Sequence, residues 1–173
     1  MIVLYRGRRG TGKTLTMVKD ILLYVNQGWD IVSNIHLHSS IPHRVLSRSE
    51  ILDLLDTNLK NYILVLDEIQ TIIDSRRSMK KDNMDFSYFI QQIRKKNIIL
   101  LATTQFTRTV DVRFREHVDI LVNPKFMGKY PAVEVEYLDL TTQEDLGYIQ
   151  SKIIVYDPKP IFNLYDTTET QST

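Results

Sequence analysis

An eight-residue run near the N-terminus constrains the fold of this chain more than any other feature. The run has the pattern G-x-x-x-x-G-K-[ST] and consists of Gly7, Arg8, Arg9, Gly10, Thr11, Gly12, Lys13 and Thr14. Its glycines allow consecutive backbone N–H groups to turn toward a phosphate, and the N-terminus of a following helix points at the same anion. Such a loop needs a strand before it and a helix after it, and apolar patterns at 2–5 and 15–25 supply both.

The pattern predicts a binding site for a nucleoside triphosphate. Residues 7–14 are expected to surround its phosphates, with Lys13 reaching the β- and γ-phosphates and the hydroxyl of Thr14 ligating Mg²⁺. The run Asn-Pro-Lys-Phe at 123–126 lacks the aspartate of the guanine-reading N-K-x-D pattern, which disfavours a GTPase. The expected cofactors are therefore ATP and Mg²⁺.

The composition fits one globular domain and excludes several kinds of protein. The chain has 173 residues, 43% of them apolar and 25% charged, and its net charge of +1 gives no overall case for a nucleic-acid partner. The absence of cysteine excludes disulfides and thiolate metal sites. No apolar run reaches the roughly 18 residues of a membrane-spanning helix, and a strand that begins at residue 2 leaves no room for a signal peptide. We expect a soluble intracellular protein.

Apolar stretches alternate with helical patterns, which is typical of an α/β protein with a mainly parallel sheet. Continuous apolar runs at 62–66 and 98–102 predict two strands that are buried on both faces of the sheet. Further strands are expected at 2–5, 29–34 and 118–122, and helices at 13–27, at 84–96 and from a cap at Ser47 or Ser49 through Leu55.

The pattern changes beyond Pro124. Two stretches of alternating apolar and polar residues, 132–137 and 152–156, predict a C-terminal antiparallel hairpin. We therefore expect a single P-loop domain over 1–173, with its core at about 1–124 and the hairpin and tail at about 125–173.

The buried strand at 62–66 ends in two acidic residues, Asp67 and Glu68. An apolar strand that delivers a carboxylate is the Walker B arrangement, so Asp67 is the second expected ligand of Mg²⁺. The neighbouring Glu68 can orient and deprotonate a water for attack on the γ-phosphate. A hydrolysing enzyme needs such a base, whereas a kinase uses its acceptor substrate, so the pair favours hydrolysis of ATP to ADP and phosphate.

The next buried strand ends in polar residues, of which Gln105 is the expected sensor of the γ-phosphate, a role that Thr103 or Thr104 could share. An arginine, often from a neighbouring subunit, usually neutralises the transition state of phosphoryl transfer. Arg113 and Arg115 are the favoured candidates, without a choice between them, because they follow this strand and are expected at the rim of the nucleotide site. The other candidates are Arg76, Arg77, Arg94 and Arg108.

Two basic clusters stand out against the near-neutral chain. The first consists of Arg76, Arg77, Lys80 and Lys81, and the second of Arg94, Lys95 and Lys96. The first lies in an expected loop, where its side chains could follow a nucleic-acid backbone without reading bases. The second lies at an expected helix C-terminus, where cations complement the helix dipole in any case.

Three histidines, His36, His38 and His43, lie within one expected loop. Imidazoles at such spacing can bind a metal ion. Because no fourth ligand is near them in sequence, a polar loop is the preferred interpretation, and their role stays open.

These motifs resemble those of zonular-occludens-toxin-like and FtsK/HerA-type ATPases, including small viral DNA-packaging members. The resemblance is carried by the P-loop, by 64–68, by the arginine pair 76–77, by 98–105, and by the runs 110–115 and 162–167. It implies a RecA-like P-loop NTPase of the additional-strand type. Its mainly parallel sheet would have the strand order 5-1-4-3-2, counted along this chain, with flanking helices and the C-terminal hairpin appended.

The resemblance also implies a function. ATP would lie between the subunits of a homo-oligomeric ring, a hexamer or pentamer, with Glu68 as base, Gln105 as sensor and an arginine from the neighbour. The implied activity is translocation of double-stranded DNA, as in viral genome packaging, with capsid proteins as further partners and the host-cell cytoplasm or the virion as location. Filamentous-phage relatives carry a membrane span that this chain lacks, which argues against an anchored assembly or export role.

Two other classes stay open. A nucleoside or nucleotide kinase has a similar length and the same P-loop, and the arginines at 108, 113 and 115 could mimic its lid, but it has no use for Glu68. A non-motor ATPase, such as a helicase loader or an assembly factor, would hydrolyse ATP without moving DNA.

Overall fold

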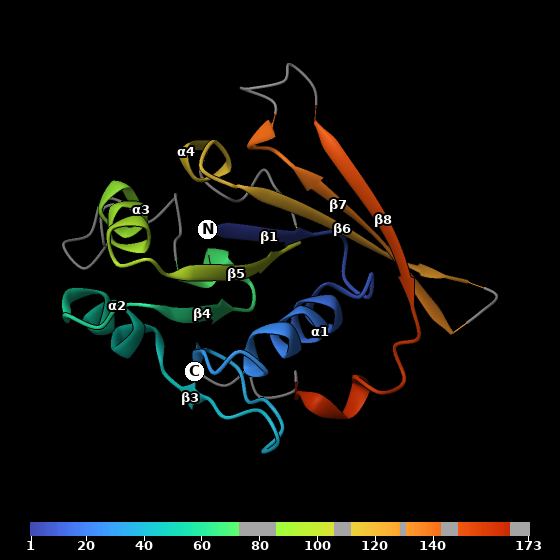
Figure 1. The fold of residues 1–173 in the computed structure, drawn as a ribbon, viewed down its shortest axis with the longest axis horizontal. Helices are drawn as coiled ribbons and strands as arrows, with labels where there is room; N and C mark the ends of the chain where they lie inside the picture. Colours follow the sequence, from blue (N-terminus) through green and yellow to red (C-terminus); the bar gives the residue numbers. More distant parts are fainter. Residues whose placement is uncertain (73–85, 106–111, 129–130, 143–148, 167–173) are drawn as a thin grey trace.

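The computed structural model describes residues 1–72, 86–105, 112–128, 131–142 and 149–166, with the side chains of 86, 87, 112 and 113 left out. One sheet of eight strands runs through this part of the chain, in the order β3-β2-β4-β5-β1-β6-β7-β8 (Figure 1). The strands are β1 (Ile2–Arg6), β2 (Asp30–Ser33), β3 (Arg44–Val45), β4 (Tyr62–Leu66), β5 (Ile99–Thr104), β6 (Ile120–Met127), β7 (Ala132–Asp139) and β8 (Gln150–Tyr156). The helices are α1 (Lys13–Val25), α2 (Arg48–Asp56), α3 (Phe86–Lys95) and α4 (Val112–Arg115), with 3₁₀ turns η1 (Ile69–Thr71) and η4 (Phe162–Leu164).

The parallel half of the sheet has the predicted order. Strand β1 lies between β6 and β5, and β4 lies between β5 and β2, with every one of these pairs parallel. Counted over the five strands that the sequence predicts, this is the order 5-1-4-3-2. The two-residue strand β3 adds a parallel edge next to β2 that the sequence did not predict. Because β5 separates β1 from β4, the P-loop and the Walker B residues lie one strand apart.

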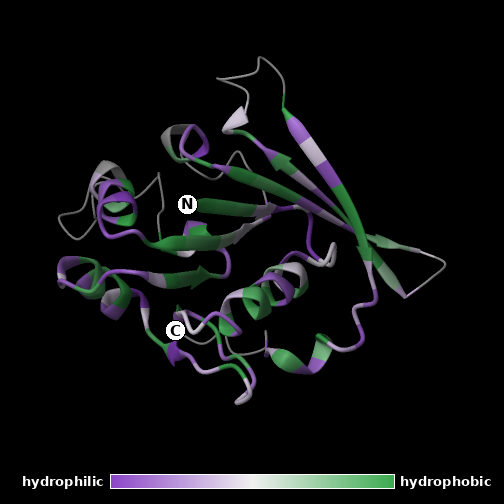
Figure 2. Ribbon diagram, viewed as in Figure 1, coloured by the Kyte–Doolittle hydropathy of each residue, from purple (hydrophilic) through white to green (hydrophobic). Residues whose placement is uncertain are grey.

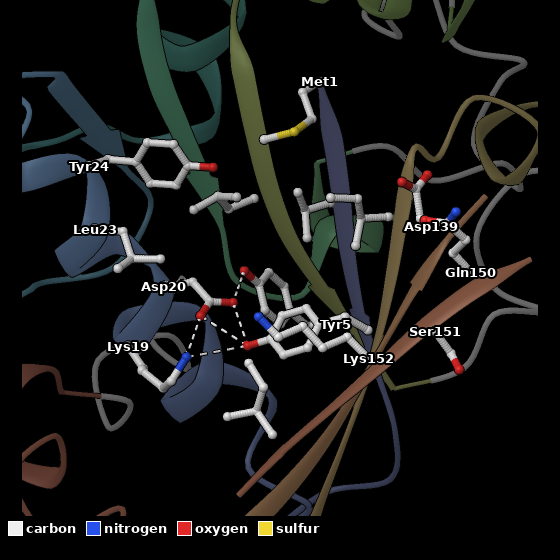
Figure 3. Close-up of a pocket in the computed structure, with 15 residues that line it drawn as sticks. Met1, Tyr5, Lys19, Asp20, Leu23, Tyr24, Asp139, Gln150, Ser151 and Lys152 are labelled. Atoms are coloured by element: carbon white, nitrogen blue, oxygen red, sulfur yellow. Dashed lines mark hydrogen bonds and ion pairs between the residues drawn. The ribbon is translucent and has the colours of Figure 1, made fainter. Parts of the chain in front are cut away.

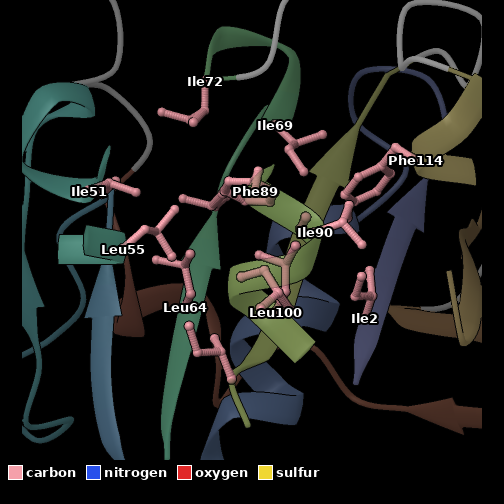
Figure 4. Close-up of a cluster of buried hydrophobic side chains, with 14 of the residues drawn as sticks. Ile2, Ile51, Leu55, Leu64, Ile69, Ile72, Phe89, Ile90, Leu100 and Phe114 are labelled. Carbon is pink, nitrogen blue, oxygen red and sulfur yellow. The ribbon is translucent and has the colours of Figure 1, made fainter. Parts of the chain in front are cut away.

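Side chains of the central strands alternate between two hydrophobic clusters, one on each face of the sheet. On one face, Leu64 and Leu100 pack beneath α2 and α3 with Ile51, Leu55 and Phe89 (Figure 4). On the other face, their neighbours Val65 and Leu101 pack against Leu15, Val18 and Ile21 of α1. Figure 2 shows this apolar character along the central strands and both hydrophilic and hydrophobic residues along β8. Burial on both faces is the reason why β4 and β5 are continuously apolar.

Strand β6 is longer than predicted, because it continues past Pro124 to Met127. Its parallel pairing with β1 ends at Val122, and beyond that residue β7 is its described neighbour. Proline has no N–H to donate, but it is tolerated where one side of a strand has no partner. The predicted hairpin forms as β7 and β8, which pair in antiparallel register. Through β6 it continues the main sheet.

The predicted short helix is capped by Ser47, not Ser49. The Ser47 hydroxyl accepts a hydrogen bond from the backbone N–H of Glu50 at 3.4 Å, and the Ser47 N–H donates to the Glu50 carboxylate at 2.7 Å. This reciprocal capping box satisfies two backbone donors at the start of α2. The helix continues one residue beyond the predicted end, to Asp56.

A C-terminal segment, residues 157–166, returns from β8 across the molecule and is called the strap below. Two backbone hydrogen bonds join the strap to the loop that holds His36, His38 and His43, called the histidine loop below. The His38 N–H donates to the Leu164 carbonyl at 2.7 Å, and the Asp166 N–H donates to the His36 carbonyl at 3.2 Å. The ring of His43 forms a hydrogen bond within the same loop, because its Nε2 accepts from the Leu37 N–H at 3.1 Å. In the described part of the chain no group of three or more His, Cys, Asp or Glu side chains is arranged to hold a metal ion.

Candidate nucleotide-binding site

The P-loop joins the end of β1 to the start of α1, as its sequence predicts. Gly12 immediately precedes the helix with φ +95°, a left-handed conformation that strains any residue with a Cβ. At Gly7, an added Cβ would lie 2.5 Å from Oγ1 of Thr11, so the turn also excludes a side chain there. Lys13 is only 6% exposed, and its Nζ donates to the Arg8 carbonyl at 3.3 Å. Its ammonium therefore lies over the loop, where phosphates would bind.

The two expected Mg²⁺ ligands lie in contact. Thr14 Oγ1 donates to Asp67 Oδ1 at 2.8 Å, and Thr103 Oγ1 donates to the same oxygen at 2.8 Å. Asn34, which the sequence analysis did not single out, holds the backbone of Asp67 from the end of β2. Its side chain donates to the Asp67 carbonyl at 2.9 Å and accepts from the Asp67 N–H at 2.7 Å. A hydroxyl beside a carboxylate is an oxygen donor set that fits Mg²⁺.

The electrostatics of Asp67 also fit a cation. Burial raises the pKa of Asp67 above its ordinary value, because it disfavours the charged carboxylate. The hydrogen bonds from Thr103 and Thr14 oppose that rise, the charge of Glu68 adds to it, and the charge of Lys13 lowers it. A divalent cation at this position would stabilise the ionised form by its own charge.

Glu68 is held by two amide side chains. Nε2 of Gln105 donates to Glu68 Oε1 at 3.0 Å, and Nε2 of Gln70 donates to Glu68 Oε2. The backbone of Glu68 is left-handed, with φ +53°, and its N–H donates to Thr103 Oγ1 at 2.8 Å. A non-glycine residue in this conformation stores strain, which the surrounding contacts must hold in place. The carboxylate thus lies beside the expected Mg²⁺ ligands in a defined orientation.

The polar residues at the end of β5 connect the strands. Gln105 contacts the carboxylate of Glu68 through its side-chain amide. Thr103 binds the two acidic residues, while Thr104 Oγ1 donates to Gln70 at 3.2 Å. The sequence analysis missed Gln70 because its position depends on η1, a turn that carries no motif.

A pocket of about 400 Å³ lies between the P-loop and these strand ends. Its phosphate side is lined by Arg9, Gly10, Gly12, Lys13, Thr14, Leu15, Asp67, Glu68 and Gln105. Its other side is aromatic and consists of Phe126 from β6 and of Phe162 and Tyr165 from the strap. Burial and the charge of Asp67 raise the pKa of Tyr165, so its phenol stays protonated. The run 162–167 carried part of the family resemblance, but no motif assigned these rings to the site.

Of the arginines and lysines expected at the nucleotide site or at DNA, most lie outside the described residues, and Arg115 lies at the opposite end of β1 from the P-loop. The side chain of Arg113, together with Arg76, Arg77, Lys80, Lys81 and Arg108, lies outside the described residues. Arg115 is exposed at the end of α4, and Asp119, just after it, donates its N–H to the Ile2 carbonyl at 2.9 Å. Arg115 thus lies where β1 begins, whereas the P-loop follows the end of β1. The expectation that Arg115 borders the nucleotide site is therefore wrong for the site of its own chain.

A second pocket, of about 410 Å³, lies on the α1 face between that helix and β7–β8 (Figure 3). Its polar centre is Asp20, whose carboxylate accepts from the hydroxyl of Tyr5 at 2.9 Å, from that of Tyr137 at 3.0 Å and from Nζ of Lys19 at 2.7 Å. Because Asp20 follows the P-loop on α1, this cluster joins the phosphate-binding helix to β1 and β7.

The fold and the site together define a class. A parallel core of this strand order, with a P-loop after β1 and a carboxylate pair after β4, makes the protein a RecA-like P-loop NTPase. The family model of the zonular occludens toxin (Zot) matches residues 1–172, and the chain belongs to that family. Among curated proteins, none matches the sequence.

Solved structures share the fold. The N-terminal domain of zonular occludens toxin from Neisseria meningitidis aligns with a TM-score of 0.66 at 20% identity, over 95% of this chain and 98% of that one. The genome packaging NTPase B204 of Sulfolobus turreted icosahedral virus 2, in complex with ATP-gammaS, aligns with a TM-score of 0.60 at 14% identity, over 88% and 95%. The flagellar accessory protein FlaH from Methanocaldococcus jannaschii aligns with a TM-score of 0.55 at 13% identity, over 90% and 84%.

No helix among the described residues is long and apolar enough to cross a membrane.

Proposed function

We propose that this chain is an Mg²⁺-dependent ATPase that hydrolyses ATP to ADP and phosphate. The observation that carries the proposal is the carboxylate of Glu68, which two amides hold directly beside the Asp67–Thr14 pair. A carboxylate in that place can accept a proton from a water aligned with the γ-phosphate. A kinase would need no such group, because its acceptor hydroxyl replaces the water.

Each residue of the site has a place in the reaction. The P-loop backbone and Lys13 bind the phosphates, and Thr14 and Asp67 would hold Mg²⁺. When bound, the ion neutralises charge that develops on the phosphate oxygens. Glu68 takes the proton of the attacking water, and Gln105, bonded to Glu68 at 3.0 Å, links the base to the end of β5. When the γ-phosphate leaves, we expect the hydrogen bond between Gln105 and Glu68 to change before the rest of the site does.

We further propose that hydrolysis drives translocation of double-stranded DNA by a homo-oligomeric ring, a hexamer or a pentamer, in viral genome packaging. Membership of the Zot family and the shared fold with the packaging NTPase B204 support this proposal. Arg113 or Arg115 would complete the site of a neighbouring subunit, and Arg76, Arg77, Lys80 and Lys81 would contact DNA. Arg115 lies away from its own P-loop, which is compatible with action on a neighbour.

The test compares three reactions of the purified protein with MgATP: alone, with double-stranded DNA, and with nucleosides or nucleotides as acceptors. Hydrolysis that double-stranded DNA stimulates supports the motor. Transfer of phosphate to an acceptor would identify a kinase and refute the ATPase. Slow turnover that DNA does not change would favour an assembly factor or a helicase loader.

The shared site has its own test. Arg115→Ala and Lys13→Ala variants, each inactive alone, should regain activity when mixed, because a mixed ring contains sites with both an intact P-loop and an intact arginine. The same experiment with Arg113→Ala decides between the two arginines. If neither mixture recovers activity, neither arginine acts in trans.

A further inference from the structure

One side of the P-loop pocket is aromatic, and the phosphate chemistry makes no use of it. Phe126 from β6 and Phe162 from the strap line this side, next to Gly12 and Leu15. We propose that the rings of Phe126 and Phe162 form the subsite for the base of the nucleotide and hold it by stacking and apolar contact. The proposal rests on the ATPase function proposed above.

The exposure of the two rings is the first argument. Of the phenylalanine side chains that the structure describes, Phe89 and Phe114 are buried in the core, at 1% and 0% exposure. Phe126 and Phe162 are 36% and 50% exposed, and both line this pocket. An aromatic face left in water forgoes the hydrophobic stabilisation of its burial. A flat ligand in the pocket would cover both rings.

The position of the rings is the second argument. A Cβ at Gly12 would lie 3.3 Å from Cε2 of Phe126, so that ring borders the junction of the P-loop and α1. Phe162 is held from a distant part of the chain, because the strap around it pairs with the histidine loop through the His38–Leu164 and Asp166–His36 backbone bonds. A ligand that extends from the P-loop to these rings has a polyanionic end and a planar apolar end, as a nucleotide does.

The polar side chains of the pocket are the third argument. Four of those at the phosphate end bind one another in pairs: Thr14 binds Asp67, and Gln105 binds Glu68. Among the side chains that line the aromatic end, the polar group is the phenol of Tyr165. A site that reads the edge of a base rejects the wrong base strongly, because its buried polar groups would lose their partners. Stacking tolerates any base, because each base has a π-face. We therefore expect the affinities for ATP and GTP to agree within about tenfold.

The experiment measures binding of MgATP and of magnesium tripolyphosphate, which carries the phosphates without a base, by calorimetry. In Phe162→Ala the Kd for ATP should rise about tenfold, the loss typical of one base-stacking ring, while the Kd for tripolyphosphate stays unchanged. Phe162→Trp should retain the affinity for ATP. Its added indole should be quenched by ATP and not by tripolyphosphate, against the background of the single natural tryptophan, Trp29. Ile153→Ala, which trims a 64% exposed side chain on β8 outside this pocket, is the matched control and should bind both ligands normally.

The possible outcomes distinguish failure of the base subsite from failure of the proposed ATPase function. An unchanged Kd for ATP in Phe162→Ala, or equal weakening of ATP and tripolyphosphate, overturns the stacking role. A wild-type protein that binds tripolyphosphate as tightly as ATP would also overturn it, while leaving the phosphate site intact. A hundredfold preference for ATP over GTP contradicts recognition by stacking alone. Binding of neither ligand by the wild type refutes the proposed ATPase and the subsite with it.

Discussion

The two sides of the nucleotide pocket are built in different ways. On the phosphate side, the ends of the parallel strands β1, β4 and β5 bring together groups that already lie in short motifs. On the aromatic side, Phe126 and the strap residues come from β6 and from the chain beyond β8, and no local pattern relates them. The first side depends on the sheet order alone, whereas the second depends on where the antiparallel extension and the C-terminal segment come to lie. Chemistry and base contact can therefore be separated by mutation.

The largest effect is expected on the phosphate side. Glu68→Gln keeps the size and shape of the side chain but removes the base, so kcat should fall by about 10²–10⁴-fold. The Kd for ATP should stay close to that of the wild type, since the P-loop is unchanged. Single-turnover hydrolysis and calorimetry measure the two quantities. Full residual turnover would show that Glu68 is not the base. The phosphate side of the pocket would then lack the catalytic group that distinguishes it from the aromatic side.

The next effect concerns Gly12, a position where the two sides of the pocket meet. Gly12→Ala places a Cβ at φ +95° and 3.3 Å from the Phe126 ring. We expect a loss of about 1–2 kcal/mol in the free energy of unfolding, from left-handed strain, together with weaker ATP binding. Gly128→Ala is the matched control, because an added Cβ there meets nothing within 4 Å. Urea titration of both variants tests this, and equal stability of the two would show that Gly12 is not constrained.

A smaller effect is expected where α1 joins the antiparallel extension. Tyr137→Phe removes the hydroxyl that donates to Asp20 at 3.0 Å and should cost about 1 kcal/mol of unfolding free energy. Burial raises the pKa of Tyr137, and the charge of Asp20 adds to the rise. The unfolded chain therefore loses this proton first, near pH 10, so stability is full below that pH and falls as pH increases above it.

Tyr137→Phe should accordingly flatten the loss of stability in alkaline solution. Tyr88→Phe is the comparison, because the hydrogen bond between Tyr88 and Asp56 also raises the pKa of that phenol but lies at the surface, where solvent screens its effect on stability. Denaturant titrations between pH 8 and about pH 11 measure both. Identical slopes for wild type and Tyr137→Phe would mean that this cluster does not couple α1 to β7 through the phenol.

The smallest effect on stability is expected at the N-cap of α2, away from the nucleotide pocket, and it gives a scale for the other changes in unfolding free energy. Ser47→Ala deletes a purely local contact, the N-cap of α2, far in sequence from both sides of the pocket. It should lower the unfolding free energy by about 0.5–1 kcal/mol and leave ATP binding unchanged. Ser49→Ala, two residues further along, should change stability less, because Glu50 bonds to Ser47. If the order of these two variants is reversed, the assignment of the cap is wrong.

Much of the parallel half could be predicted from residues alone. The strands at 62–66 and 98–102 can be recognised because burial on both faces leaves no polar position. The capping box at Ser47 and the alternation in β7 and β8 are likewise local signals. The predicted strand at 118–122 ends too early, since a proline is normally evidence against a strand. Pro124 is tolerated because the pairing of β6 with β1 ends at Val122, and no described strand pairs with that side of β6 beyond it. The expected place of Arg115 is wrong because sequence order does not tell at which end of the sheet the chain arrives after 106–111.

By itself, the sequence predicted the phosphate loop, the carboxylate pair Asp67 and Glu68, and the buried central strands. These predictions follow from local physics, because backbone conformation, helix start and two-sided burial leave a mark within a few residues. The order of the central strands came from the family resemblance, and the structure has that order. Only the tertiary structure decided which side chains hold Glu68, which residue positions Asp67, and which rings stand beside the P-loop. Gln70, Asn34, Phe126 and Phe162 belong to the site through contacts made across strands and along a returning segment. Such contacts depend on how distant parts of the chain pack, and no short pattern encodes them.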